Sequence, residues 1–117
     1  MMQDIAKLHI RALPHTLSSR MGEGFVSFLY YLVSRFGEIR EVRRDGKIVG
    51  ALSMIGPWIL TLVVDPSYQH KGIGREMVEE LSGRRYVYTE ENSRGFYQKL
   101  GFKVMCKIGK IIFLWRK

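Results

Sequence analysis

The sequence has one cysteine, few prolines and no long hydrophobic run. Because Cys106 has no second cysteine to pair with, an internal disulfide is excluded and a zinc site built from cysteines is disfavoured. No apolar stretch approaches the roughly 20 residues that span a bilayer, and residues 1–11 lack the apolar block of a signal peptide. We therefore expect a cytoplasmic protein that holds no metal and contacts no membrane.

Negative charge is also scarce, because 11 acidic residues stand against 19 basic ones and the net charge is +8. The basic residues are spread along the chain and form no single block, which disfavours nucleic acid as a partner without excluding it. A polyphosphorylated cofactor or an acidic partner would use some of them. The 117 residues contain no linker or low-complexity segment, so we expect a single domain over residues 1–117.

The spacing of apolar residues predicts two helices ahead of a sheet. Asp4 is placed to cap the first helix, which ends at Pro14. The second helix carries an apolar stripe at helical spacing, predicted to face the core. This stripe consists of Phe25, Phe28, Leu29, Leu32, Val33 and Phe36. Strands at 39–44 and 47–55 then flank Asp45 and Gly46, a strong hairpin signal.

The rest of the chain alternates strands and helices. The continuous apolar strand 58–64 predicts cover on both faces of the sheet. The further elements expected are a helix at 73–83, a strand at 86–89, a helix capped by Asn92 or Ser93 and ended by Gly101, and strands at 104–108 and 111–116. Cys106 alternates with Val104 and Ile108, which predicts a buried side chain. The fold class is thus mixed α/β with about four helices.

The segment QHKGIG at residues 69–74 lies between the apolar strand and the following helix. Gly72 and Gly74 let the main chain approach a bulky anion, and the free N–H groups at a helix start attract phosphate. The order of residues does not fit a P-loop, and Met77 stands where a dinucleotide fingerprint needs its third glycine. The alternative is a glycine turn that binds nothing.

Two blocks resemble the GNAT superfamily of acyl-CoA N-acyltransferases. The first is LVVDP at 62–66 followed by QHKGIG at 69–74, and the second is NSRGFYQKLGF at 92–102. The resemblance covers most of the chain and implies a GNAT-like fold, a mostly antiparallel central sheet splayed at the cofactor cleft. The strand that usually comes first in that family is not expected here, which would leave the strand at 39–44 at a sheet edge or paired with a second protomer.

The resemblance also implies the cofactor, acetyl-CoA, and its site. Main-chain groups of Leu62, Val63 and Val64 would hold the pantetheine arm, although their side chains are also explained as core. The remaining cofactor-binding residues implied are Gln69, His70, Lys71, Gly72, Ile73, Gly74, Arg75, Asn92, Tyr97 and Lys99. The commoner form of the family has an asparagine seven residues before the tyrosine, where Glu90 stands here, so Asn92 is either a cofactor ligand or a helix cap.

Tyr97 is the side chain expected to act chemically, because the resemblance places it beside the thioester sulfur. A phenol there can protonate the departing thiolate, whereas the alternative is an aromatic packed in the core. Glu90 and Glu91 are the candidate general bases, and Glu38, Glu41 and His70 come behind them. The alternative for each glutamate is a solvated surface charge.

The resemblance thus implies an N-acetyltransferase that moves an acetyl group from acetyl-CoA to a primary amine by direct attack on the thioester. The amine acceptor is a small molecule or a peptide, and a homodimer is expected. The rival is a non-catalytic CoA-binding or protein-interaction module on the same fold. A small basic nucleic-acid binder is a third alternative, for which the sequence has no recognised motif.

Overall fold

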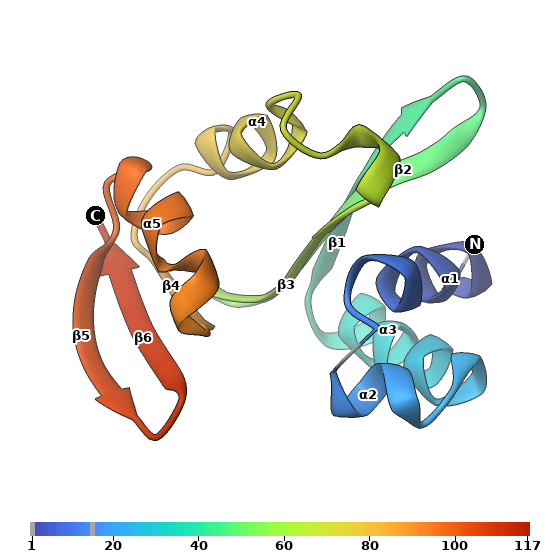
Figure 1. Ribbon diagram of the computed structural model, residues 1–117, viewed down its shortest axis with the longest axis horizontal. Coiled ribbons are helices and arrows are strands. Elements are labelled where there is room, and N and C mark those ends of the chain that lie inside the picture. Colours follow the sequence, from blue (N-terminus) through green and yellow to red (C-terminus); the bar gives the residue numbers. More distant parts are fainter. Residues whose placement is uncertain (1, 15) are drawn as a thin grey trace.

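The computed structural model describes residues 2–14 and 16–117, which form a six-stranded sheet with helices on both faces (Figure 1). The strand order is β1-β2-β3-β4-β6-β5, and all neighbours are antiparallel except β3 and β4, which are parallel. The strands are β1 (Glu38–Arg44), β2 (Lys47–Ile55), β3 (Trp58–Val64), β4 (Arg85–Thr89), β5 (Lys103–Ile108) and β6 (Ile111–Arg116). The helices are α1 (Met2–Ala12), α2 (Leu17–Arg20), α3 (Glu23–Phe36), the 3-10 helix η1 (Pro66–Tyr68), α4 (Ile73–Glu79) and α5 (Glu91–Lys99).

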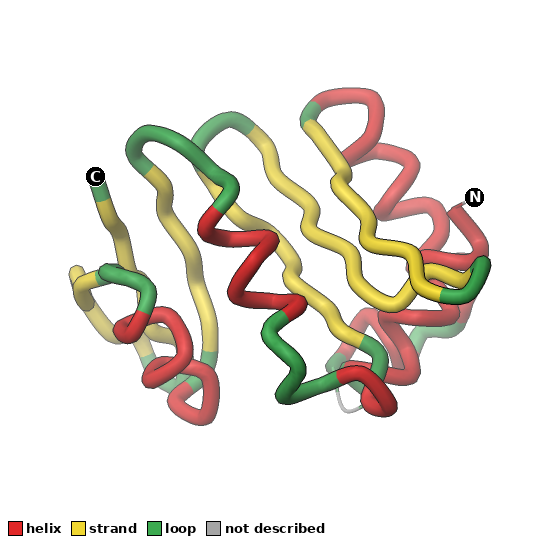
Figure 2. The backbone as a smooth tube through the Cα atoms, turned by 90° about the horizontal axis from the view of Figure 1, so that it is seen from above, coloured by secondary structure: helices red, strands yellow, loops and turns green. Residues whose placement is uncertain are grey.

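The sheet divides the core into two clusters. On one face α1 and α3 pack against β2 and β3, through Leu8, Tyr30 and Val63 among others. On the other face α4 and α5 pack against the middle of the sheet, through Met77 and Tyr97 among others. Figure 2 shows α4 and α5 in front of the strands and the N-terminal helices behind them. The cover on both faces confirms the prediction from the continuous apolar sequence of β3.

The sheet opens between its two parallel strands. β3 and β4 pair only at Trp58 with Tyr86 and at Ile59 with Val87, and beyond these residues the strands diverge. β3 also carries a β-bulge, because the register with β2 shifts between Ser53 and Met54. The expected splay is therefore present, and the last residues of β3 lack a strand neighbour on the β4 side.

The two predicted hairpins form where the turn residues predict them. Asp45 and Gly46 have φ angles of 54° and 79°, which suits the tight turn between β1 and β2. Gly109 has φ 60° in the turn between β5 and β6. β1 pairs only with β2 and lies at one edge of the sheet, in agreement with the expectation for residues 39–44.

The N-terminal helices differ from the prediction in two ways. A four-residue helix, α2, was not expected, so the described residues contain five α-helices and not about four. In α3 the side chains that are buried are Val26 and Tyr30, whereas Phe28 and Phe36 of the predicted stripe are 55% and 69% exposed. Apolar residues cover most of the circumference of α3, so periodicity alone could not tell which of them meet the sheet. Among the helices of the described residues, none is both long and apolar enough to cross a bilayer.

Three local predictions are also wrong. Cys106 is exposed, because β5 is an edge strand and a register shift between Val104 and Cys106 breaks the alternation of the strand. The residue at the cap of α5 is Glu90, so Asn92 and Ser93 lie within the first turn. Asp4 likewise lies in the first turn of α1 and does not precede the helix.

Candidate active site

A cavity of about 420 Å³ lies where β3 and β4 have separated, between the end of β3, the glycine turn and α5. It brings together eleven of the thirteen residues predicted to bind the cofactor. These are Leu62, Val63, Val64, Gln69, His70, Gly72, Ile73, Gly74, Arg75, Asn92 and Tyr97. Lys71 and Lys99 do not line this cavity, and both are exposed.

Main-chain direction along β3 separates the three residues predicted to hold pantetheine. The N–H of Asp65 donates to the carbonyl of Val49 on β2 at 2.8 Å. Because main-chain groups alternate in direction along an antiparallel pair, Val63 also turns its groups toward β2, while Leu62 and Val64 turn theirs toward the cavity. The Val64 carbonyl accepts a hydrogen bond from Gln69 Nε2 at 3.1 Å. The groups left for a ligand are therefore the N–H and carbonyl of Leu62 and the N–H of Val64.

The glycine turn has the geometry of an anion cradle. Gly72 precedes α4 with φ 83° and ψ 5°, a left-handed conformation that side chains rarely adopt, and a Cβ there would meet open space. The first helical hydrogen bond runs from the Glu76 N–H to the Gly72 carbonyl at 3.0 Å. The N–H groups of Ile73, Gly74 and Arg75 thus have no acceptor within the helix and face the cavity side of the turn.

Tyr97 is only 5% exposed, yet it borders the cavity from α5. Its ring packs edge-on against Phe96 and Phe102, with centroids 5.0 and 5.4 Å away. Burial raises the pKa of the Tyr97 phenol, and no hydrogen bond from the described residues lowers it. The hydroxyl is therefore protonated at neutral pH and free to donate a hydrogen bond.

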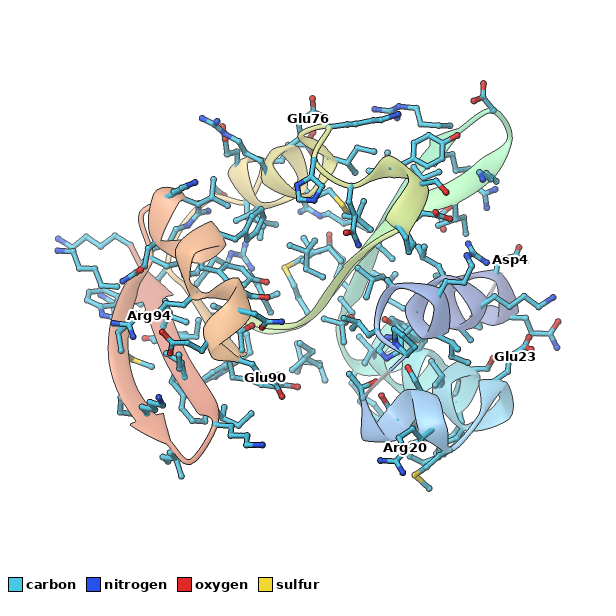
Figure 3. All side chains as sticks on the ribbon, viewed as in Figure 1. Asp4, Arg20, Glu23, Glu76, Glu90 and Arg94 are labelled. Carbon is cyan, nitrogen blue, oxygen red and sulfur yellow. The ribbon has the colours of Figure 1, made fainter. Side chains whose placement is uncertain are left out.

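A second cavity of about 590 Å³ lies on the other side of Tyr97, toward α1 and α2. Leu62, Asn92 and Tyr97 line both cavities, so these residues stand at the junction. Glu90 belongs to the second cavity, and its side chain projects from the start of α5 toward the N-terminal helices (Figure 3). Of the candidate bases, Glu90 is the carboxylate that the structure brings to the Tyr97 junction.

The other candidate bases lie elsewhere. Glu91 forms ion pairs with Arg94 at 3.2 Å and Lys107 at 3.8 Å, and it lines a small cavity that Glu90 also borders but not the cavity at Tyr97. Glu38 and Glu41 pair with arginines on the β1 edge strand, and His70 lines only the first cavity. In residues 2–14 and 16–117 no group of three or more His, Cys, Asp or Glu side chains could hold a metal ion.

Sequence reasoning missed a buried polar chain beside the second cavity. His9 Nδ1 lies 2.8 Å from the Tyr30 hydroxyl, which lies 3.0 Å from Thr61 Oγ1 on β3, and His9 Nε2 lies 3.2 Å from Ser18 Oγ. Burial lowers the pKa of His9, so its ring is neutral at pH 7. The signal was present, because His9 follows Ile5 by one helical turn and so falls on the apolar face of α1.

The splayed sheet, the glycine turn beside it and the cover on both faces of the sheet together define an acyltransferase fold. A family model described as an acetyltransferase (GNAT) domain matches residues 36–104, more than half of the chain. The chain therefore belongs to the GNAT family.

Solved structures agree on the fold. The chain superposes on PH1933 from Pyrococcus horikoshii with a TM-score of 0.80 and 19% identity, covering 99% of this chain and 89% of that one. For the PaiA N-acetyltransferase of Thermoplasma acidophilum, solved in complex with coenzyme A, the TM-score is 0.74 and the identity 20%, covering 99% of this chain and 92% of that one. For the ribosomal-protein-S18-alanine N-acetyltransferase of Escherichia coli the TM-score is 0.71 and the identity 16%, covering 98% of this chain and 86% of that one. A search of curated protein sequences finds no match.

Proposed function

We propose that this protein transfers an acetyl group from acetyl-CoA to a primary amine by direct attack on the thioester. The observation that carries the proposal is Tyr97, a residue only 5% exposed whose hydroxyl has no hydrogen-bond partner among the described residues and which stands at the junction of two cavities. One cavity has the main-chain groups that suit a coenzyme, and the other is open to an acceptor. A reaction between two substrates needs this arrangement.

The first cavity fits coenzyme A through main-chain groups. The pantetheine amides would pair with Leu62 and Val64 as an added strand along the open side of β3. The diphosphate would lie on the N–H groups of Ile73, Gly74 and Arg75. In this mode the N–H of Leu62 or Val64 also polarises the thioester carbonyl as negative charge develops on its oxygen.

In the reaction the amine nitrogen attacks the carbonyl carbon, the carbon–sulfur bond breaks, and the proton lost by nitrogen balances the proton gained by sulfur. A CoA-like thiol has a pKa near 8.5 and an unperturbed phenol a pKa near 10, so full proton transfer from tyrosine costs about 2 kcal/mol. Burial of Tyr97 raises this cost further. Tyr97 therefore stabilises the departing sulfur by a hydrogen bond. Its phenol gives the proton to the sulfur only as it receives the proton that the amine nitrogen loses.

The acceptor amine must reach the thioester uncharged. For a lysine-type amine with a pKa of about 10.4, deprotonation at pH 7 costs roughly 4.6 kcal/mol, whereas for an α-amine near 7.8 it costs about 1 kcal/mol. Glu90 is the base we assign to this step, directly or through water, because it lines the cavity on the acceptor side of Tyr97.

The test is release of CoA thiol from acetyl-CoA with a panel of primary amines, together with calorimetric titration of acetyl-CoA. Binding with amine-dependent thiol release supports the enzyme. Tight binding without release from any amine would leave the non-catalytic CoA-binding module.

A homodimer formed through the exposed edge of β1 also remains a prediction. Light scattering after size exclusion that gives only monomer at high protein concentration would contradict it.

A further inference from the structure

The acceptor-side cavity continues into an apolar groove of about 560 Å³. The two spaces share His9, Ser18, Leu60, Thr61 and Tyr88, so they form one path that runs from Tyr97 along β3 to the C-terminal end of α3. The far part of the groove is walled by Leu32, Val33 and Phe36 of α3 and by Ile55 of β2. A volume of this size suits a small organic ligand.

The bulge in β3 lies where the groove meets the acceptor-side cavity, because Leu60 and Thr61 line both spaces. Ser53 pairs with Thr61 and Met54 with Ile59, which leaves Leu60 as the extra residue of β3. A bulge interrupts the regular alternation of side chains along a strand, and the two residues at this bulge, Leu60 and Thr61, both line the groove. The bulge thus adds an apolar wall next to the polar Thr61.

Charge distribution separates this path from the rest of the molecule. The chain has a net charge of +8, yet no lysine or arginine of the described residues lines either part of the path. His9 is the imidazole that the described residues contribute to the lining, and burial lowers its pKa so that it stays neutral. Glu90, at the Tyr97 end, is the one carboxylate that the described residues contribute.

We propose that the acceptor is a small primary monoamine with an apolar aliphatic or aromatic body, its amine at Glu90 and Tyr97 and its body on Leu60, Tyr88 and Phe36. This inference rests on the proposed function and names the substrate class of the same site. A single carboxylate complements a single cation, and a monoamine with an apolar body leaves no second charge in the groove. Polyamines and aminoglycosides would bring further cations to a surface that offers them no partner.

The first test compares n-pentylamine, 1,5-diaminopentane and ethylamine in the thiol-release assay. The first two have the same five-carbon chain and differ only in the second amino group at the far end of the diamine, and ethylamine is too short to reach the groove. We expect kcat/KM for pentylamine to exceed that for each of the others by at least about tenfold, since each buried methylene is worth about a fourfold gain. Equal or higher values for the diamine would overturn the inference and leave the acetyltransferase proposal intact.

The second test places a charge at the far end of the groove. Phe36→Lys should lower kcat/KM for pentylamine about fivefold or more and leave ethylamine unchanged. Phe36→Glu should raise the value for 1,5-diaminopentane relative to the wild type. Phe28→Lys is the matched control, because Phe28 is an exposed phenylalanine of the same helix that does not line the groove. If both lysine variants behave alike, the groove does not bind the acceptor.

A binding measurement makes the inference independent of turnover. With CoA present, titration with pentylamine should shift the amide resonances of Leu60 and Tyr88, and equal concentrations of 1,5-diaminopentane should shift them less. Absence of the pentylamine shifts overturns the inference whether or not thiol is released. A concentration-dependent dimer that Phe36→Lys dissociates, with no change in amine preference, would assign the groove to a second copy of the chain and also overturn it.

Discussion

The two sides of Tyr97 are built from different parts of the chain. The cofactor side uses main-chain groups of β3 and of the glycine turn, which depend on backbone geometry and on a few glycines. The acceptor side uses side chains from α1, α2, α3, β3 and β4, such as His9, Leu60 and Tyr88. Under the proposed function, main-chain geometry would bind the coenzyme on the first side, and side chains would bind the acceptor on the second.

The sharpest way to test this division is to remove the group that both sides share. Tyr97→Phe should lower kcat by about 10²–10³-fold, because the departing sulfur loses its hydrogen-bond donor, and should leave acetyl-CoA affinity within about threefold. Tyr86→Phe is the matched control, since Tyr86 stacks on Trp58 and lines neither cavity. Unchanged kcat in Tyr97→Phe would show that the sulfur leaves without this phenol.

The cofactor side alone is tested by Gly72→Val. Because φ at Gly72 is 83°, a β-branched residue costs about 1–2 kcal/mol or more in backbone strain and reshapes the turn, so the dissociation constant for CoA should rise at least about tenfold. Gly83→Val provides the control, since Gly83 has φ 78°, faces open space and lies outside the cavity. Both variants should lose stability in a denaturant titration. Equal CoA affinities in the two variants would count against a diphosphate site at this turn.

The connection between the two sides is tested at Asp65. This carboxylate accepts hydrogen bonds from the Ser67 N–H at 2.9 Å and from Arg11 of α1 at 3.0 Å, and it joins the end of β3 to the N-terminal helices. The Ser67 hydrogen bond is the largest cause, and the Arg11 guanidinium a further one, of a lowered pKa at Asp65. Asp65→Asn should lower the free energy of unfolding at pH 7 by about 1 kcal/mol.

The sign of the pH dependence follows from the direction of that shift. Since the folded-state pKa of Asp65 lies below the unfolded value of about 3.9, the stabilisation is complete above that value and is lost as the pH falls through the folded pKa. The difference between wild type and Asp65→Asn in urea unfolding should therefore shrink toward zero in strong acid.

The smallest effect on coenzyme affinity and turnover is expected from changes at a residue that lines neither cavity. Cys106 is exposed on the edge strand β5 and lines neither cavity, so it should react with one equivalent of a thiol reagent in the native protein. Blocking it should leave CoA affinity and turnover unchanged, and Cys106→Ser should behave as the blocked protein does. Because thiol release is the assay for the proposed reaction, the variant also removes a background signal.

The fold and the position of the glycine turn were predictable because short-range signals specify them. The Asp45-Gly46 turn, the apolar β3 sequence and the glycine turn each act over a few residues, and the structure agrees with all three. The acceptor side was not predictable, because it depends on which face of α3 meets the sheet and on a bulge at Leu60. Neither property leaves a local pattern, since α3 is apolar around most of its circumference.

The errors at Cys106 and Asn92 have the same origin. A bulge shifts the register of β5, and α5 begins two residues earlier than an Asn92 cap would give, which moves its cap to Glu90. Each is a displacement of one or two positions that leaves the element itself intact. Asn92 therefore does not serve as the cap, and it lines both cavities.

The parallel contact between β3 and β4 spans two residue pairs, so the sheet is almost two separate sheets, β1-β2-β3 and β4-β6-β5, that meet along a short seam. A ligand strand lying along β3 would lengthen that seam. Ligand-free protein should therefore exchange its β4 amides with deuterium sooner than those of β2, and coenzyme should slow that exchange. The contact between β3 and β4, the shortest pairing in the sheet, would then be stabilised when the coenzyme binds and weakened again when the product leaves.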